Sequence, residues 1–167
     1  KPYLNNINSL KNNTMPISKL NEPENPAKEM CNKLNYEQKC SYLALVYIFG
    51  RFSRHNPEYM RRADRYVEQV SSTVGVSVDC AKQYFETHGM AQGLKDCLKT
   101  INDSFFIEQL IFDCFVLSSL SSSIEKRNDA SALLFDFFAE FGYSQTGIQS
   151  LMERQFAMFN MCGGFED

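Results

Sequence analysis

An internal repeat constrains the fold of this chain more than any other feature. Shifted forward by 67 residues, the first half lies on the second half without a gap. The positions that the shift pairs share apolar character or the same turn residue: Leu43 with Leu110, Ala63 with Ala130, Val70 with Phe137, Gly75 with Gly142, and Ser77 with Ser144. Because a repeat fixes the architecture, we expect two similar helical units related by a pseudo-two-fold axis, over about residues 34–100 and 101–160.

Capping residues predict where the helices begin and end. Asn35 is followed three residues later by Gln38, which is typical of a capping box. Pro57 follows Asn56 and suits the first helical position, and Gly75 suits the left-handed residue after a helix. The predicted helices cover about residues 36–53, 57–74, 78–88, 90–101, 104–120 and 124–141, with a last one after Ser144. Alternation typical of strands is absent, so we predict an all-α bundle of about seven helices.

The first helix of each unit is apolar on all sides, over residues 43–49 and 111–117. A helix without a polar face has to be surrounded by protein, so we expect these two helices to pack together. Asp113 interrupts the second of them, at the position equivalent to Val46. A buried carboxylate needs a partner or a raised pKa, and we expect Asp113 at the rim, near a helix end or an arginine.

Composition excludes several classes of protein. With 44% hydrophobic residues, the 167-residue chain can build a core without metal or disulfide support. A net charge of −3 lacks the basic footprint of nucleic-acid binding, and no apolar run is long enough to span a membrane. The six cysteines form no CxxC pair, so we expect a reduced, cytoplasmic protein.

The chain divides into three parts by composition. Residues 1–27 are rich in Asn and Pro and show no sustained periodicity, which predicts a flexible leader. Residues 28–160 are expected to form a single all-helical duplicated domain, and residues 161–167 a flexible C-terminal tail.

Two segments carry a resemblance to a known family. NPEYMRRADRYVEQVSSTVGVS (residues 56–77) is similar to the second helix and following turn of TerB-like domains, the all-helical fold of tellurite-resistance proteins and of the N-terminal part of a DnaJ-like co-chaperone. SIEKRNDASALLFDFFAEFGYS (residues 123–144) resembles the same element again, and TerB-like domains are internal duplications. The resemblance covers roughly residues 34–159 and implies a helical scaffold in a stress or tellurite-resistance-like response.

The chain departs from the family at its acidic motif. TerB-like units carry Asp-Gly in the loop before the second helix and an acid about a turn later, and these carboxylates are associated with metal binding. The corresponding loops here, residues 51–55 and 118–123, contain no carboxylate. Glu58 and Glu125 remain, but one carboxylate per unit does not supply the converging oxygens that a hard cation needs. We therefore predict no metal and no cofactor.

A basic cluster surrounds the first interhelical loop and is the first candidate binding site: Arg51, Arg54, Arg61, Arg62 and Arg65. It could bind an acidic peptide, a phosphate or an anionic membrane surface. Glu58 and Glu68 stand three residues from Arg61 and Arg65, and charge runs of this kind are usually a solvated face of ion pairs, which is the alternative.

The C-terminal end offers a second candidate contact surface. Met158, Met161 and Phe165 lie off the apolar stripe of the last helix or beyond it. Exposed Met and Phe would suit an adaptable partner contact, and the alternative is that the tail covers the domain itself.

These features favour a non-enzymatic protein-binding or scaffold domain, whose partner is another protein or a second copy of the chain. The alternative is a metal-dependent or enzymatic module whose site assembles from Glu58, Glu125, His55 and a cysteine.

Overall fold

The computed structural model describes residues 32–51, 53–89, 92–101, 103–120 and 123–161, and these residues form α-helices and no strand. The predicted leader and the tail beyond Met161 lie outside them. The helices are α2 (Tyr36–Phe49), α3 (Pro57–Val74), α4 (Val78–His88), α5 (Gln92–Leu98), α6 (Ser104–Ser119), α7 (Ile124–Ala139) and α8 (Gln145–Met161). The all-α prediction is confirmed for this part of the chain.

The helices begin where the capping residues predict. Asn35 accepts from the backbone N–H of Gln38 at 2.8 Å, and the Gln38 side chain accepts from the Asn35 N–H at 2.9 Å. This reciprocal pair satisfies two backbone donors that the first turn leaves open. Asn56 caps α3 with Pro57 at its first position, and Ser77 caps α4.

The helix ends agree less well with the prediction. Gly75 and Gly142 adopt the expected left-handed conformation, with φ of 79° and 84°. α2 ends at Phe49 rather than near residue 53, and Gly50, the residue with the lowest helix propensity besides proline, closes it. α7 and α5 are also shorter than predicted, because weakly bonded terminal turns carry no distinct sequence signal.

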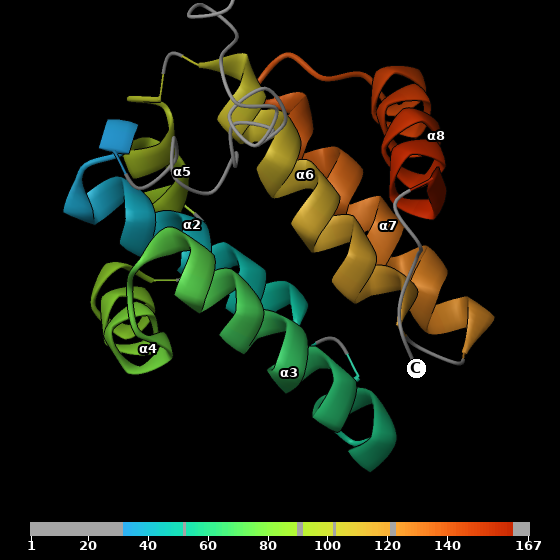
Figure 1. Ribbon diagram of the computed structural model, residues 1–167, viewed down its shortest axis with the longest axis horizontal. Helices are drawn as coiled ribbons and strands as arrows, with labels where there is room; N and C mark the ends of the chain where they lie inside the picture. Colours follow the sequence, from blue (N-terminus) through green and yellow to red (C-terminus); the bar gives the residue numbers. More distant parts are fainter. Residues whose placement is uncertain (1–31, 52, 90–91, 102, 121–122, 162–167) are drawn as a thin grey trace, which may run out of the picture.

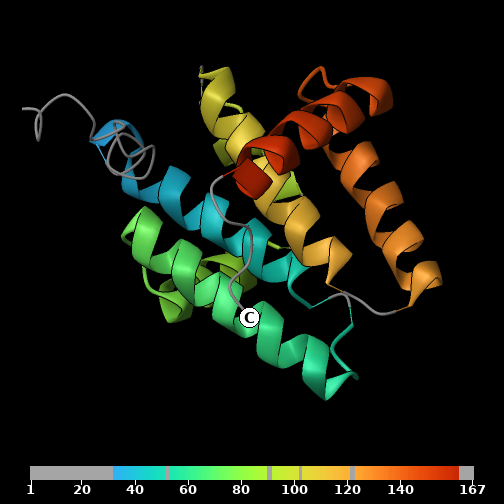
Figure 2. The same cartoon turned by 45° about the vertical axis from the view of Figure 1, so that its right-hand side comes forward.

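The two apolar helices pack against each other in the middle of the molecule, as predicted. α2 contacts α3, α4, α5 and α6, whereas α6 contacts α7 and α8 as well as α2. The views in Figures 1 and 2 show α3 to α5 gathered around α2, and α7 and α8 on the far side of α6. The chain therefore forms two helical groups that meet along α2 and α6.

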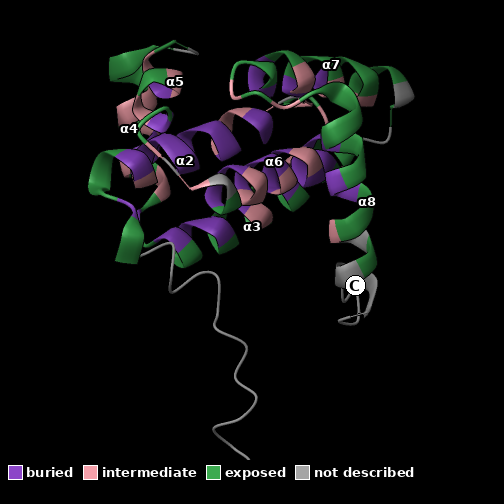
Figure 3. Cartoon of the chain, turned by 90° about the horizontal axis from the view of Figure 1, so that it is seen from above, coloured by how far each residue is buried: buried purple, intermediate pink, exposed green. Residues whose placement is uncertain are grey.

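The core runs along this central pair. The side chains of residues 42–46 on α2 are at most 2% exposed, and Figure 3 shows α2 buried along most of its length. On α6, Leu110, Ile111 and Cys114 are completely buried. Burying each large apolar side chain contributes about 1.5–3 kcal/mol, so this core is the main source of stabilisation in the fold.

Polar contacts also join the two groups. The Tyr59 hydroxyl of α3 lies 3.0 Å from the carbonyl oxygen of Phe49 and 3.1 Å from that of Leu117, near the C-terminal ends of α2 and α6. Lys95 of α5 forms a 2.6 Å ion pair with Glu140 just after α7, and its side chain is only 12% exposed. Both contacts restrain how the groups sit relative to each other.

Candidate functional site

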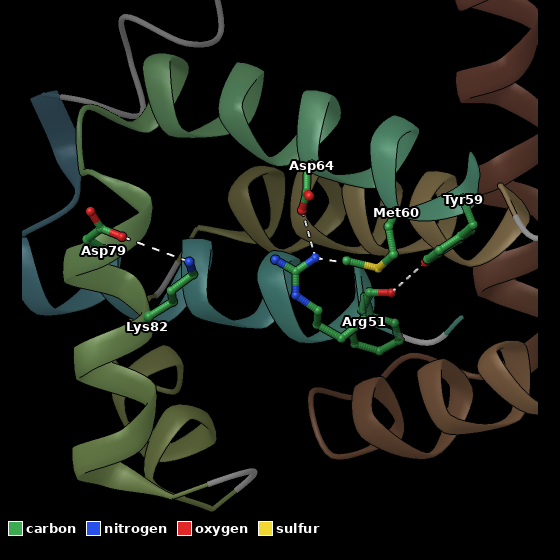
Figure 4. A network of polar contacts seen from close by, with 7 residues as sticks. Arg51, Tyr59, Met60, Asp64, Asp79 and Lys82 are labelled. Carbon is green, nitrogen blue, oxygen red and sulfur yellow. Dashed lines mark hydrogen bonds and ion pairs between the residues drawn. The ribbon is translucent and has the colours of Figure 1, made fainter. Parts of the chain in front are cut away.

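The five arginines of the predicted basic cluster do not play equivalent roles. Arg51 is turned toward the protein, where its guanidinium forms a 2.7 Å ion pair with Asp64 and stacks 4.3 Å from the centre of the Tyr47 ring. Figure 4 shows it reaching between Asp64 and Met60 of α3. Arg51 therefore fastens α3 to the end of α2 and is not free for a partner.

Arg62 is engaged on its own helix. It forms a 2.8 Å ion pair with Glu58 one turn earlier, so Glu58 pairs with Arg62 and not with Arg61, which stands three residues from it. The i,i+4 spacing allows this pair to form with extended side chains on the helix surface. Both side chains are more than half exposed, so the pair contributes little to stability.

Arg54, Arg61 and Arg65 remain exposed, and we call these three the open arginines. Among the described residues, none of them forms an ion pair; Arg54 has only a long 3.5 Å contact from Nε to Nε2 of His55. Arg61 and Arg65 lie on the outer face of α3, because its inner face is buried through residues such as Tyr59, Ala63 and Val67. These cations can therefore receive an external anion without breaking an internal contact.

The second candidate surface, formed by Met158, Met161 and Phe165, lies mostly outside the described part of the chain. Met158 and Met161 lie in the last turns of α8, but their side chains are not among those described. Phe165 lies outside the described residues altogether. The structure thus adds no contact that bears on these three residues.

The residues of the alternative metal or catalytic site are not brought together. Within the described ranges, no group of three or more His, Cys, Asp or Glu side chains could hold a metal ion. Glu58 is committed to Arg62, and His55 lies beside Arg54. No observation in this part of the chain assembles Glu58, Glu125, His55 and a cysteine into a site.

The cysteines that the structure describes are free thiols: Cys40, Cys80, Cys97 and Cys114. Burial raises the pKa of Cys40 and, more strongly, that of Cys114, so both stay protonated and are poor nucleophiles. The Sγ of Cys97 lies 2.9 Å from the Tyr84 hydroxyl, which joins α4 to α5. Cys31 and Cys162 lie outside the described residues.

Asp113 does not lie where the sequence predicted. It is 5% exposed and lies inside the bundle rather than at its rim. The Tyr42 hydroxyl donates to its Oδ2 at 2.5 Å and the Tyr66 hydroxyl donates to its Oδ1 at 2.7 Å. Two tyrosines thus take the place of the expected arginine, and we call the three residues the Tyr–Asp–Tyr cluster.

Burial dominates the ionisation of this cluster. It raises the pKa of Asp113 from its ordinary value of 3.8 to about 6, although the hydrogen bonds from Tyr42 and Tyr66 and the Gln109 side chain favour the ionised form. Burial, and then the charge of Asp113, raise the pKa of both tyrosines well above 10. The tyrosines therefore remain donors at every physiological pH, while the charge of Asp113 changes near neutrality.

Comparisons of the chain with protein-family models, with curated proteins and with solved structures give no match. No helix in the described ranges is both long and apolar enough to cross a membrane.

Proposed function

We propose that this chain is a duplicated, TerB-like, non-enzymatic module that binds an acidic segment of another protein through the open arginines. A role in a stress or tellurite-resistance-like response belongs to the same proposal and rests on the resemblance of residues 56–77 and 123–144 to that family.

The helix contacts support the duplication. In the first group α2 packs on α3 and α4, and α3 packs on α4; the second group has the corresponding contacts of α6 with α7 and α8, and of α7 with α8. The left-handed glycines after α3 and before α8 stand at equivalent positions, Gly75 and Gly142. Two copies of one unit, related by a rough dyad, would produce the same helix contacts and the same left-handed glycines in both groups.

The binding role is inferred from the exposure of the open arginines. Three cations stand without an ion pair to any described residue, in a chain whose net charge is −3. In an ordinary solvated face, neighbouring acids would neutralise them, as Glu58 does for Arg62. Arginine also forms paired hydrogen bonds with a carboxylate, which gives an acidic partner both affinity and orientation.

The duplication makes this surface specific to the first unit. The positions on α7 equivalent to Arg61 and Arg65 hold Asn128 and Ala132, which are uncharged. The shared scaffold alone therefore does not require cations at these positions. An acidic protein segment fits them better than a membrane does, because Glu58 and Asp64 interrupt the cationic surface around the open arginines and leave no continuous positive face for an anionic bilayer.

Binding of a defined probe tests the proposal. The probe is a fluorescent peptide of alternating Glu and Phe, and fluorescence anisotropy measures its dissociation constant at 0.1 M salt. The double variant Arg61→Glu and Arg65→Glu should bind at least about tenfold more weakly, since charge reversal makes two favourable contacts repulsive. The matched control, Lys126→Glu and Arg154→Glu, changes the net charge equally at exposed positions on α7 and α8 and should bind like the parent.

Equal weakening in both variants, or no binding by the parent, would reject the acidic-segment proposal. Two further probes separate the other partner classes. Binding to vesicles containing phosphatidylserine but not to the peptide would indicate a membrane surface, and concentration-dependent sedimentation that Arg61→Glu and Arg65→Glu abolish would indicate a second copy of the chain.

A further inference from the structure

The Tyr–Asp–Tyr cluster lies where three helices meet. Tyr42 comes from α2, Tyr66 from α3 and Asp113 from α6, so the hydrogen bonds of one carboxylate join the two helical groups. Tyr42 is completely buried, whereas Tyr66 is only half-buried. Tyr66 is therefore the more exposed of the two tyrosines that hold Asp113.

The surroundings of Asp113 supply donors and no positive charge. The titratable groups that face it are Tyr42 on α2, Tyr66 on α3 and the neighbouring thiol of Cys114 on α6 itself. Within the described ranges no charged group reaches it from α7 or α8, and Asp113 takes part in no ion pair. An ionised carboxylate at this place is held by uncharged donors alone, the Tyr42 and Tyr66 hydroxyls and the Gln109 side chain, which compensate only part of its lost hydration.

Protonation changes what these hydroxyls can do. The ionised carboxylate accepts from both tyrosines, but a protonated carboxyl donates from one oxygen, and the hydroxyl facing that oxygen has to accept instead. The Tyr42 hydroxyl has no other recorded acceptor among the described residues and is inaccessible to water. Tyr66 is the more exposed of the two tyrosines, so the exchange of donor and acceptor is easier at Oδ1 than at Oδ2.

We propose that the Tyr–Asp–Tyr cluster is a proton-linked joint, at which α3 separates from α6 more readily when Asp113 is ionised than when it is protonated. Separation of α3 lifts Tyr66 away and returns the carboxylate to water, where the charged form is favoured. This inference does not depend on the proposed partner, although α3 carries two of the open arginines on its other face.

The direction follows from linkage. The closed state has the higher Asp113 pKa, about 6 against 3.8 in water, so it binds the proton more tightly than the open state does. The extra stability of the closed state is fully present below about pH 4 and is lost as the pH rises through about 6. From these two values the opening constant should increase about tenfold between pH 5 and pH 7.5.

Native-state hydrogen exchange of the full chain measures this opening directly. The exchange of α3 amides, corrected for the intrinsic rate at each pH, should indicate about tenfold more opening at pH 7.5 than at pH 5. Asp113→Asn, which keeps the shape and stays neutral, should remove this dependence. Glu68→Gln removes an exposed carboxylate of α3 that takes part in no ion pair among the described residues, and it should leave the dependence intact. A dependence that survives in Asp113→Asn, or that is missing from the parent, overturns the proposal.

A second measurement keeps the proposal testable if Asp113→Asn does not fold. Carbon-detected NMR follows the Asp113 carboxyl during a pH titration, and its midpoint should fall near 6 in the parent. Tyr66→Phe removes a donor that favours the ionised form, so its midpoint should lie higher. A parent midpoint near 4, or no upward shift in Tyr66→Phe, contradicts the joint.

Discussion

At the scale of single residues, two buried tyrosines differ in the charge of their hydrogen-bond acceptors. The Tyr42 hydroxyl donates to the carboxylate of Asp113, whereas the Tyr59 hydroxyl donates to backbone carbonyl oxygens. A hydrogen bond to a charged acceptor is worth roughly twice one to a neutral acceptor. The two positions therefore form a matched pair for separating the effect of charge from that of packing.

Tyr42→Phe should destabilise the protein by about 2–3 kcal/mol at pH 7.5, where the ionised Asp113 loses its donor on Oδ2. At pH 5 the cost should be clearly smaller, because burial has raised the pKa of Asp113 to about 6 and most molecules carry a neutral carboxyl. Urea denaturation at the two pH values measures both costs. Tyr59→Phe is the control and should cost about 1 kcal/mol at either pH. Equal losses for Tyr42→Phe at both pH values would contradict a charged acceptor.

Arg51 should contribute through its planar shape as well as its charge. Arg51→Lys keeps the cation but loses the planar guanidinium that stacks on Tyr47 and donates to Asp64, so we expect a loss of about 1 kcal/mol. Arg62→Lys changes an exposed pair on one helix and should cost less than about 0.5 kcal/mol. Thermal denaturation of both variants compares the costs, and an equal loss would show that Arg51 acts as an ordinary surface cation.

The sequence identified the arginines but did not show which of them form ion pairs within the protein. It also placed Asp113 at the rim of the bundle, whereas Asp113 lies inside it. Arg51 is distinguished by Asp64, which lies 13 residues away, and this pairing depends on how α3 turns back onto α2. The Asp113 carboxylate accepts hydrogen bonds from two tyrosines that lie 71 and 47 residues away in the sequence. Local pattern rules describe spacings of three or four residues, so contacts at such separations become visible only when the helices are assembled.

At the scale of helices, substitutions at Gly142 test whether the left-handed glycine that both units share ends the preceding helix. Its φ of 84° lies in the left-handed region, and a Cβ at this position would meet no atom within 4 Å. Gly142→Ala should therefore cost about 1 kcal/mol from backbone conformation alone. Gly142→Asn should cost less, because asparagine tolerates this conformation better. Chemical denaturation of the two variants measures the difference, and a neutral Gly142→Ala would refute the role of this glycine as a helix stop.

The sequence predicted where the helices begin more accurately than where they end. A capping side chain makes a specific hydrogen bond, as Asn56 does to the Tyr59 N–H at 3.1 Å, so the residue type marks the position. The ends of α2 and α7 carry no such bond and came out shorter than predicted. They depend on where a neighbouring helix stops covering the last turn.

At the scale of the whole molecule, the all-round apolar character of two segments predicted that α2 and α6 pack together, and they do. That inference succeeded because burial on every side leaves such a helix few alternatives. The pseudo-two-fold axis and the acidic partner stay proposals, since hydrophobicity is not directional and exposed charge does not identify what binds it. We propose binding on the first unit because of the asymmetry between the units: Arg61 and Arg65 in one stand where Asn128 and Ala132 stand in the other.

Chemical-shift mapping with the same acidic peptide tests this location most directly. Titrating the peptide into the ¹⁵N-labelled chain should shift amide signals in the loop of residues 53–56 and along α3 around Arg61 and Arg65, while the signals of α7 and α8 stay in place. Shifts that concentrate on α7 or α8, or that spread evenly over both units, would contradict a binding surface built on the open arginines.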